Sequence, residues 1–282
     1  MFKKYLLSIA LIGLGLSPAC FAFEREIAIT IDDLPFVGSP HLRTSKTEPS
    51  QNRFLSLMQA LIDNNVPATG FVIAGSIGKG QWQLLEQFQQ AGFILGNHTY
   101  THENLNTTAA DKYIANVAKA DQILAPLMSS TRYFRYPYLA EGRGNKKQQV
   151  QKYLKENNYV IAPVTIDSKD FLFNKKLYQK PASHREEHIN QIKQKYLSYI
   201  WRETLLAENE IKQSANPNAK QILLIHANLL NSYCMGDIIE LFKRNGYRFI
   251  SLDEALQQPT RNPSPKVVTT DMPNDMLDWE WL

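Results

Sequence analysis

Short runs of aliphatic and β-branched residues alternate with amphipathic helical patterns along most of this chain of 282 residues. Such runs are typical of buried strands, and apolar residues three and four positions apart are typical of helices. The expected strands are 26–31, 68–74, 93–95, 132–135, 159–166, 221–225 and 247–252. The expected helices are 52–65, 81–92, 109–128, 146–158 and 236–246. Strands that alternate with helices favour an α/β fold with a mainly parallel sheet, either open or closed into a barrel.

Two segments depart from this alternation. Residues 172–219 form a long, charged helical stretch where only a short connection is expected. From residue 257 onward the chain is rich in proline, which favours an extended tail. We therefore expect one α/β domain over 23–256, with a helical insertion at about 172–219, and an extended tail over 257–282.

The N-terminus has the pattern of a secretory signal peptide. Two lysines, Lys3 and Lys4, precede an apolar run from Leu6 to Leu16, and small residues follow up to Ala22. The run is shorter than the roughly 20 residues that a membrane-spanning helix needs. We expect residues 1–22 to be removed and the protein to be exported, periplasmic or secreted, without a stable membrane span. An uncleaved anchor or a buried first helix is the alternative.

Removal of the signal peptide also bears on charge and on disulfides. It lowers the formal net charge from +4 to +2 and leaves no long basic run, so nucleic acid is not an expected partner. It removes Cys20 and leaves Cys234 as the one cysteine of the mature chain, which excludes an internal disulfide. The fold must then be held by its apolar core.

Charged or metal-binding side chains follow five of the expected strands, at the C-terminal end of each. These residues are Asp32, Asp33, His98, Arg135, Asp167 and His226. In parallel α/β folds, active sites are built at the edge where the C-terminal ends of the strands meet. Each residue alone also fits a structural role, such as a solvated turn or a buried histidine. Together they predict one site.

The segment Gly96–His102, "GNHTYTH", adds a second histidine, His102, four positions after His98. One carboxylate and two imidazoles form the ligand set of many hydrolytic zinc sites, with positions left open for water or substrate. A second aspartate beside the metal could accept a proton from that water, and a histidine opposite could protonate a leaving group. The residue types therefore favour a metal-assisted hydrolase.

Five short motifs in this order resemble those of the polysaccharide deacetylases, also called the NodB homology family or carbohydrate esterase family 4. The resemblance runs from about Ile27 to Leu256. The motifs are "TIDD" (30–33), "HTYTH" (98–102), "RYPY" (135–138), "DSKDF" (167–171) and "LLIH" (223–226).

The resemblance implies a distorted (β/α)7 TIM-like barrel and metal-dependent removal of N-acetyl or O-acetyl groups from a glycan. It assigns Asp33, His98 and His102 as ligands of a divalent metal, Zn²⁺ first, with Co²⁺ or Ni²⁺ as alternatives.

The resemblance also implies catalytic roles. Asp32 would be the general base, Arg135 would pair with it, and His226 would be the general acid. The backbone N–H of Tyr138 would stabilise the oxyanion. An aspartate of "DSKDF" would hold His226 protonated, and Asp167 is expected in preference to Asp170 because it stands at the strand end.

The chain departs from the family pattern at three positions. Ile31 precedes the aspartate pair where an aromatic residue is usual, and Leu34 follows it where glycine is usual. Phe171 takes a position where tryptophan is common. The metal and acid–base residues are complete in spite of these changes. An acetylated glycan or oligosaccharide is therefore the expected substrate, but the residues do not select the glycan, and they do not predict an oligomeric state.

Three other interpretations compete with this one. "HREEH", from His184 to His188, matches an inverted metalloprotease pattern, but its charged surroundings favour a surface helix. A metal-free hydrolase of small amides would be expected to lack part of the aspartate–histidine set. A periplasmic carbohydrate-binding protein without catalysis would be expected to have lost Asp32 or His226.

Overall fold

The computed structural model describes residues 25–35, 47–179, 181 and 185–256. The expected signal peptide over 1–22 and the expected tail over 257–282 lie outside these residues, so both remain expectations. Within the described part of the chain, no helix has the length and apolar character needed to cross a bilayer.

The core of the molecule is one sheet of eight strands, all of them paired in parallel. The order is β5-β4-β3-β2-β1-β7-β6, and β8 pairs with the first part of β1. The strands are β1 (Arg25–Leu34), β2 (Ala68–Val72), β3 (Ile94–Asn97), β4 (Arg132–Phe134), β5 (Tyr159–Ile161), β6 (Ile166–Asp167), β7 (Gln221–His226) and β8 (Tyr247–Phe249).

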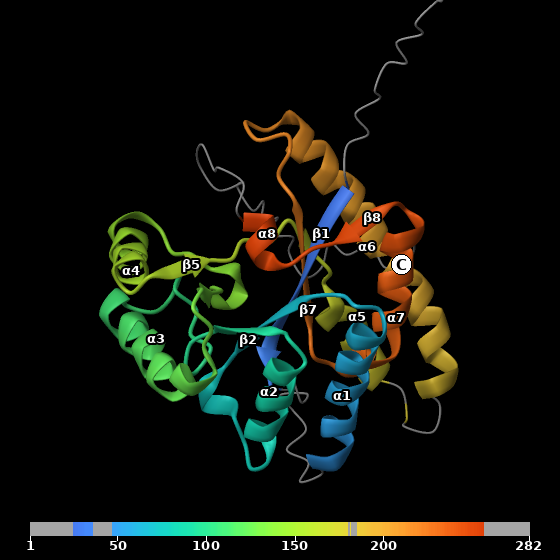
Figure 1. Cartoon of the computed structure of the whole chain (residues 1–282), viewed down its shortest axis with the longest axis horizontal. Coiled ribbons are helices and arrows are strands. Elements are labelled where there is room, and N and C mark those ends of the chain that lie inside the picture. Colours follow the sequence, from blue (N-terminus) through green and yellow to red (C-terminus); the bar gives the residue numbers. More distant parts are fainter. Residues whose placement is uncertain (1–24, 36–46, 180, 182–184, 257–282) are drawn as a thin grey trace, which may run out of the picture.

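Helices surround this sheet, as Figure 1 shows, with α3 and α4 on one side of β1 and α1, α5, α6 and α7 on the other. The helices are α1 (Thr47–Asp63), α2 (Gln81–Gln90), α3 (Ala110–Leu124), α4 (Gly144–Glu156), α5 (Asp170–Tyr178), α6 (Arg185–Gln213), α7 (Leu229–Arg244) and α8 (Leu252–Leu256). Short 3-10 turns are η1 (Ala74–Ser76), η2 (Ala125–Leu127) and η3 (Pro137–Leu139). The predicted α/β fold, a distorted barrel of mainly parallel strands, is confirmed.

Strand β1 lies at the centre of the sheet and is buried along nearly its whole length. A strand covered on both faces is expected to be a continuous apolar run, which explains "EIAITI". Its neighbour β7 pairs with it from Ile27 to Asp32, and β2 pairs with it from Ile29 to Leu34. The register places Asp32 directly opposite His226, so two residues that are far apart in the sequence meet at the same edge.

The expected strand over 159–166 is two strands in the structure. Strand β5 pairs with β4, whereas β6 pairs with β7, and residues 162–165 connect these two edges of the sheet. Pro163 lies in this connection, and proline cannot donate to a strand ladder. The periodicity of the segment could not show this break, because the apolar residues continue through it.

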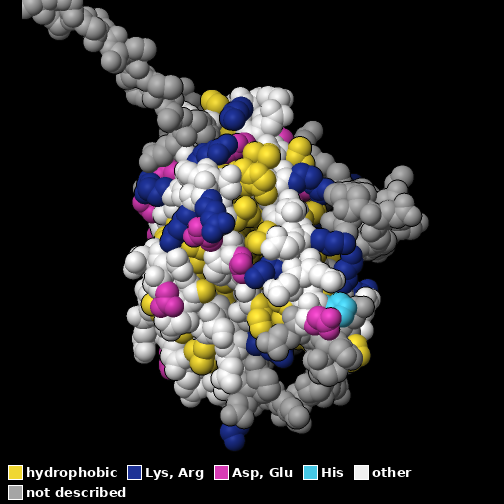
Figure 2. Space-filling view, turned by 90° about the vertical axis from the view of Figure 1, so that its right-hand side faces the viewer, with side chains coloured by type: hydrophobic (Ala, Val, Ile, Leu, Met, Phe, Trp, Pro, Cys, Tyr) yellow, Lys and Arg dark blue, Asp and Glu magenta, His cyan; other side chains and the backbone are white. Residues whose placement is uncertain are grey.

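The expected insertion over 172–219 consists mainly of α5 and α6. Helix α6 packs its buried side chains, among them Ile189, Tyr196 and Ile200, against the main core. It also reaches β1, since Arg25 forms an ion pair of 2.8 Å with the buried Glu208. The outer face of this side of the molecule carries many lysine and arginine side chains between scattered hydrophobic ones (Figure 2). The insertion is therefore part of the packed domain.

Two glycines give a matched test of the packing. A methyl group at Gly96 in β3 would lie 2.8 Å from the Phe71 ring and 3.0 Å from the Tyr133 carbonyl oxygen. We expect Gly96→Ala to lower the free energy of unfolding by about 1–3 kcal/mol, because overpacking strains a close-packed core.

Gly236 in α7 is the control, since a methyl group there meets nothing within 4 Å. We expect Gly236→Ala to raise the free energy of unfolding by about 0.5–1 kcal/mol, because glycine disfavours a helix interior. Urea unfolding of both variants measures these changes. Equal stability of the two would contradict the packing around Gly96.

Candidate metal centre and catalytic residues

The adjacent residues Asp32 and Asp33 stand in a β-bulge near the end of β1. Between the pairs Ile31–Gly70 and Leu34–Val72, two residues of β1 stand opposite one residue of β2. Successive side chains of a regular strand point to opposite faces. The bulge, together with the left-handed backbone of Asp33 (φ 63°), breaks this alternation. Both carboxylates consequently lie within 4 Å of the His98 imidazole.

His98 and His102 converge on a single oxygen of Asp33. The Nε2 atoms of His98 and His102 lie 3.4 and 3.2 Å from Asp33 Oδ1. The three possible ligand atoms all lie within 4.8 Å of one another. His102 reaches this position from a tight loop in which it has a φ of 58°. The predicted convergence of these three side chains is therefore present in the structure.

Two further observations test whether this cluster fits a cation. The Asp33 Oδ1 atom is buried and has no hydrogen-bond partner, which is rare for a buried polar atom. The Nδ1 atom of His98 lies 2.9 Å from the backbone oxygen of Arg135. Such a contact favours the tautomer protonated on Nδ1, which leaves the Nε2 lone pair available to a metal. The residues fit a divalent ion.

The charge state of Asp33 agrees with this assignment. Burial on its own raises the pKa of the carboxyl group. The imidazoles of His102 and His98, together with the charge of His226, outweigh burial and hold the pKa of Asp33 well below its usual range. Asp33 is therefore a carboxylate, which is the form that binds metal.

Arg135 is fully buried beside Asp32 and contacts several elements at once. Its Nη1 atom lies 3.4 Å from Asp32 Oδ1, and its Nη2 atom donates to Thr30 Oγ1 at 3.1 Å. Its Nε and Nη2 atoms donate to the carbonyl oxygens of Ala162 and Pro163, respectively, in the connection between β5 and β6. The predicted pairing of Arg135 with Asp32 is present. The contacts with the 162–165 connection were not predicted from the sequence.

The aspartate that contacts His226 is Asp170, so the choice of Asp167 was wrong. Asp170 Oδ1 lies 2.7 Å from His226 Nδ1, and Asp170 Oδ2 accepts the His226 backbone N–H at 2.7 Å. Asp167 instead forms an ion pair of 2.7 Å with Lys169. The reason is the short link after β6: α5 begins at Asp170 and carries this side chain into the interior.

Two asparagines complete the surroundings of Asp170 and were missed in the sequence. The side chains of Asn228 and Asn231 both donate to Asp170 Oδ2, at 2.9 and 2.5 Å. Asn231 in turn accepts from the Tyr196 hydroxyl of α6 at 2.9 Å. Asparagine favours the N-cap position of helices, and Asn228 is the N-cap of α7. Its position two residues after the motif that ends at His226 could therefore have indicated that a helix begins beside this histidine.

This network determines the charge of His226. Burial lowers the pKa of its imidazole, but the charge and hydrogen bond of Asp170, with smaller contributions from Asp33 and Asp32, raise the pKa to about 10. The His226 Nε2 atom lies 3.9 Å from Asp33 Oδ2. His226 is thus a cation beside the metal cluster, on the oxygen that the other two histidines do not approach.

Two aromatic side chains lie in the solvent next to these residues. Tyr138 is 63% exposed, and its ring centroid lies 4.5 Å from that of His102. Phe171 is 50% exposed and meets the His226 ring edge-on at 6.5 Å. Tyr138 also has a left-handed backbone, with φ at 57°. Exposed aromatic rings on both sides give the centre apolar walls.

The second histidine pair, "HREEH", gains no support as a metal site. His184 lies outside the described residues, and His188 is a partly exposed residue of α6. In the described part of the chain, the residues that could jointly hold an ion are Asp33, His98 and His102.

The fold and the cluster together define an α/β barrel protein with a His₂-carboxylate site at the C-terminal ends of its strands. The polysaccharide deacetylase family model matches residues 23–162, and the chain belongs to this family. The resemblance predicted from the five motifs is confirmed.

The curated relatives of this chain are named as deacetylases, and their sequence identity to it is low. A peptidoglycan-N-acetylglucosamine deacetylase of Bacillus cereus is 26% identical over 149 residues, which cover 52% of this chain and 47% of the relative. The chain spans about half or less of the length of the first curated relatives that it matches.

Solved structures of this fold include a chitin deacetylase from Colletotrichum lindemuthianum, with a TM-score of 0.52 and 22% identity, covering 84% of this chain and 89% of that one. They also include a carbohydrate esterase family 4 pseudoenzyme from Bacillus anthracis. It has a TM-score of 0.56 and 17% identity, and the match covers 82% of this chain and 65% of that one. These likenesses establish the fold.

The contact between Asp170 and His226 can be tested by titration of the metal-free protein. We expect Asp170→Asn to lower the pKa of His226 from about 10 toward the ordinary value of about 6.5, because a neutral amide does not stabilise the imidazolium ion. Asp167→Asn is the control and should leave this pKa unchanged. NMR titration of the His226 ring measures both, and an unchanged pKa in Asp170→Asn would contradict the assignment.

Proposed function

We propose that this protein is a metal-dependent hydrolase that removes acetyl groups, N-acetyl groups above all, from a carbohydrate. One observation carries the proposal. The carboxylate of Asp33 is approached by two histidines at one oxygen and by a charged histidine at the other, with a second carboxylate, Asp32, beside them. This arrangement supports a centre in which metal ligands, a base and an acid would act together.

Asp33, His98 and His102 would hold the ion. Two imidazoles and one carboxylate suit Zn²⁺, and they also accept Co²⁺ or Ni²⁺. When bound, such an ion supplies Lewis-acid chemistry, which acidifies water and polarises an acetyl carbonyl group. The orphaned Asp33 Oδ1 would gain the partner that it lacks.

The protein residues then supply proton transfers and positioning. Asp32 takes a proton from the attacking water, and the Arg135 guanidinium lies 3.4 Å from Asp32 Oδ1, where it balances the charge of the carboxylate. His226 gives its Nε2 proton to the leaving sugar amine or alcohol when the tetrahedral intermediate breaks down. Asp170 keeps His226 protonated until that step.

The walls of the centre would bind the acetylated sugar. The backbone N–H of Tyr138 would donate a hydrogen bond to the oxyanion of the intermediate. The exposed rings of Tyr138 and Phe171 flank the centre, so a sugar ring placed between them would bury apolar surface. Because Phe171 is smaller than the tryptophan common in the family, the wall there differs in shape.

The names of the relatives support a glycan substrate, since they are peptidoglycan and chitin deacetylases. For this chain we propose an acetylated glycan, without nucleic acid as a partner, and a domain over 23–256. An exported protein, periplasmic or secreted, would meet such glycans outside the cytoplasm. The signal-like residues 1–22 are the basis for this location.

A non-catalytic carbohydrate-binding protein is the main rival, because a pseudoenzyme shares this fold. The fold is common to both kinds of protein, and the catalytic-type residues favour the enzyme. A non-catalytic relative needs neither Asp32 as base nor His226 as acid, whereas both stand in the centre here. A metal-free hydrolase would in turn keep its activity in the presence of a chelator.

The test is acetate release across a panel of acetylated glycans, including N-acetylglucosamine oligomers and peptidoglycan. We expect turnover that a chelator abolishes and that Zn²⁺ or Co²⁺ restores. Asp33→Ala should lose both metal and activity, whereas Asp32→Asn should keep the metal and lose activity. Glycan binding without acetate release would favour the binding protein, and near-normal turnover by Asp32→Asn would contradict the base assignment.

His226→Ala tests the general acid separately. We expect kcat to fall by about 10²–10⁴-fold with little change in KM, because the acid acts on the transition state and not on the bound substrate. Steady-state kinetics on the best substrate of the panel measure both constants. A change in KM alone would make His226 a binding residue.

A further inference from the structure

The loop from His98 to His102 supplies two of the three proposed metal ligands, and its backbone is strained. Thr99 and His102 both have positive φ angles, 67° and 58°. Non-glycine residues keep such conformations only where the surroundings hold them in place. The contacts that hold this loop are therefore part of the metal site.

One side of the loop is held by the turn η1. The backbone N–H of Ala74 donates to the Thr99 carbonyl oxygen at 3.1 Å, and that of Gly75 donates to the Tyr100 carbonyl oxygen at 2.8 Å. A side chain at Gly75 would lie 2.4 Å from the Tyr100 oxygen, so only glycine permits this approach. These bonds satisfy carbonyl groups of the loop and leave its N–H groups to other partners.

The N–H groups of Thr99 and His102 bind the side chains of Asn97 and Thr99, and those of the two residues between them bind Asn116 of α3. Its Oδ1 atom accepts the backbone N–H groups of Tyr100 at 2.8 Å and Thr101 at 2.9 Å. Its Nδ2 atom donates to the Thr101 hydroxyl at 2.6 Å. Two N–H donors on one atom also fix which end of the amide is oxygen. Asn116 thus binds both residues that directly precede His102.

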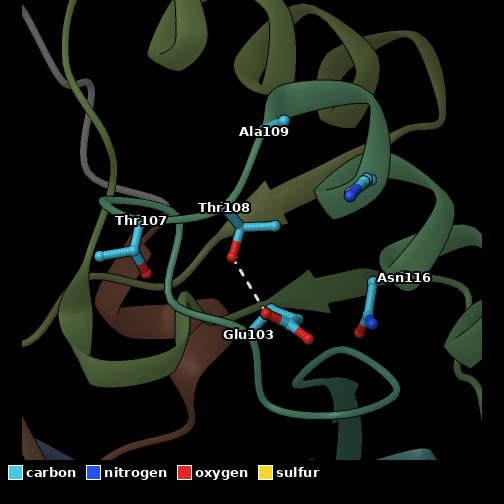
Figure 3. Close-up of a pocket in the computed structure, with 6 residues that line it drawn as sticks. Glu103, Thr107, Thr108, Ala109 and Asn116 are labelled. Atoms are coloured by element: carbon cyan, nitrogen blue, oxygen red, sulfur yellow. Dashed lines mark hydrogen bonds between the residues drawn. The ribbon is translucent and has the colours of Figure 1, made fainter.

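The hydrogen bonds continue from Thr101 to the surface. The Thr101 hydroxyl donates to Glu103 at 3.3 Å, and the other Glu103 oxygen accepts from Thr108 at 3.0 Å. Figure 3 shows Glu103, Thr108 and Asn116 around a polar pocket at the start of α3. None of the proposed metal ligands lines this pocket.

We propose that Asn116 is a positioning residue for the metal site: it holds the His98–His102 loop in the conformation in which both imidazoles meet Asp33. This inference rests on the metal binding proposed above. Asn116 does not touch the cluster itself, so its effect on metal affinity would pass through the loop backbone alone. Supporting residues of this kind commonly change metal affinity by about 10–100-fold.

The test compares Asn116→Leu with Asn116→Asp. Leucine has a similar size but no hydrogen-bonding atoms, so Asn116→Leu should weaken Co²⁺ and Zn²⁺ affinity by about 10–100-fold. It should also alter the visible absorption spectrum of the Co²⁺ protein. Aspartate keeps the acceptor for both N–H groups, so Asn116→Asp should bind metal within about threefold of the unchanged protein. Isothermal titration with each metal alone measures the affinities.

Gln122→Leu is the matched control, because Gln122 is an exposed amide on the same helix. It should leave affinity and spectrum unchanged. If Asn116→Leu does not fold, the shorter Asn116→Ser, which cannot span both N–H groups, takes its place. A thermal melt of each metal-free variant separates a loss of folding from a loss of metal affinity.

The outcomes distinguish this inference from the proposed function. Absence of metal binding in the unchanged protein would overturn the metal site itself. Normal metal binding by the unchanged protein and equally by a folded Asn116→Leu or Asn116→Ser variant would overturn the role of Asn116 alone. Equal weakening in Gln122→Leu would also overturn it, because the effect would then be a general property of α3.

Discussion

The guanidinium group of Arg135 is the contact on which both the barrel and its centre depend. This group contacts Asp32 and Thr30 on β1, and it donates to the carbonyl oxygens of Ala162 and Pro163 between β5 and β6. The Arg135 backbone oxygen also contacts His98. A buried charge is costly unless it is paired and hydrogen-bonded, and these partners meet that requirement. Arg135 therefore connects residues 162–165, which separate β5 from β6, with Asp32 and His98 in the candidate site.

Much of the fold could be predicted from the sequence, because the strands and helices have clear periodicity and the polar residues follow the strands. The prediction failed where it depended on the exact end of a strand or helix. The apolar residues continue through 159–166, so the break at Pro163 was missed. Asp167 was chosen as the partner of His226 because it stands at the end of a strand. Since α5 begins three residues later, at Asp170, the inward-facing carboxylate is the second of the two.

Other features of the centre have no signal in a single sequence. Two adjacent aspartates approach one imidazole only because a bulge interrupts β1. Four residues of the centre and its loop, Asp33, Thr99, His102 and Tyr138, have left-handed backbones without being glycine. Each such position costs of order 1–3 kcal/mol. Their conformations follow from tertiary contacts, so they become visible only when the whole fold is known.

The position of β6 at the end of the sheet order also bears on how this chain can vary over evolution. Among the described strands, β6 is hydrogen-bonded to β7 and stands at the end of the sheet order. In the described part of the chain, no strand pairs with the other edge of β6, so residues inserted after β6 interrupt no strand pairing there. The long segment containing α5 and α6 enters at this point, directly beside His226, which Asp170 at the start of α5 contacts. New surface can therefore be acquired there without a change in β1, which carries Asp33, or in β3, which directly precedes His98.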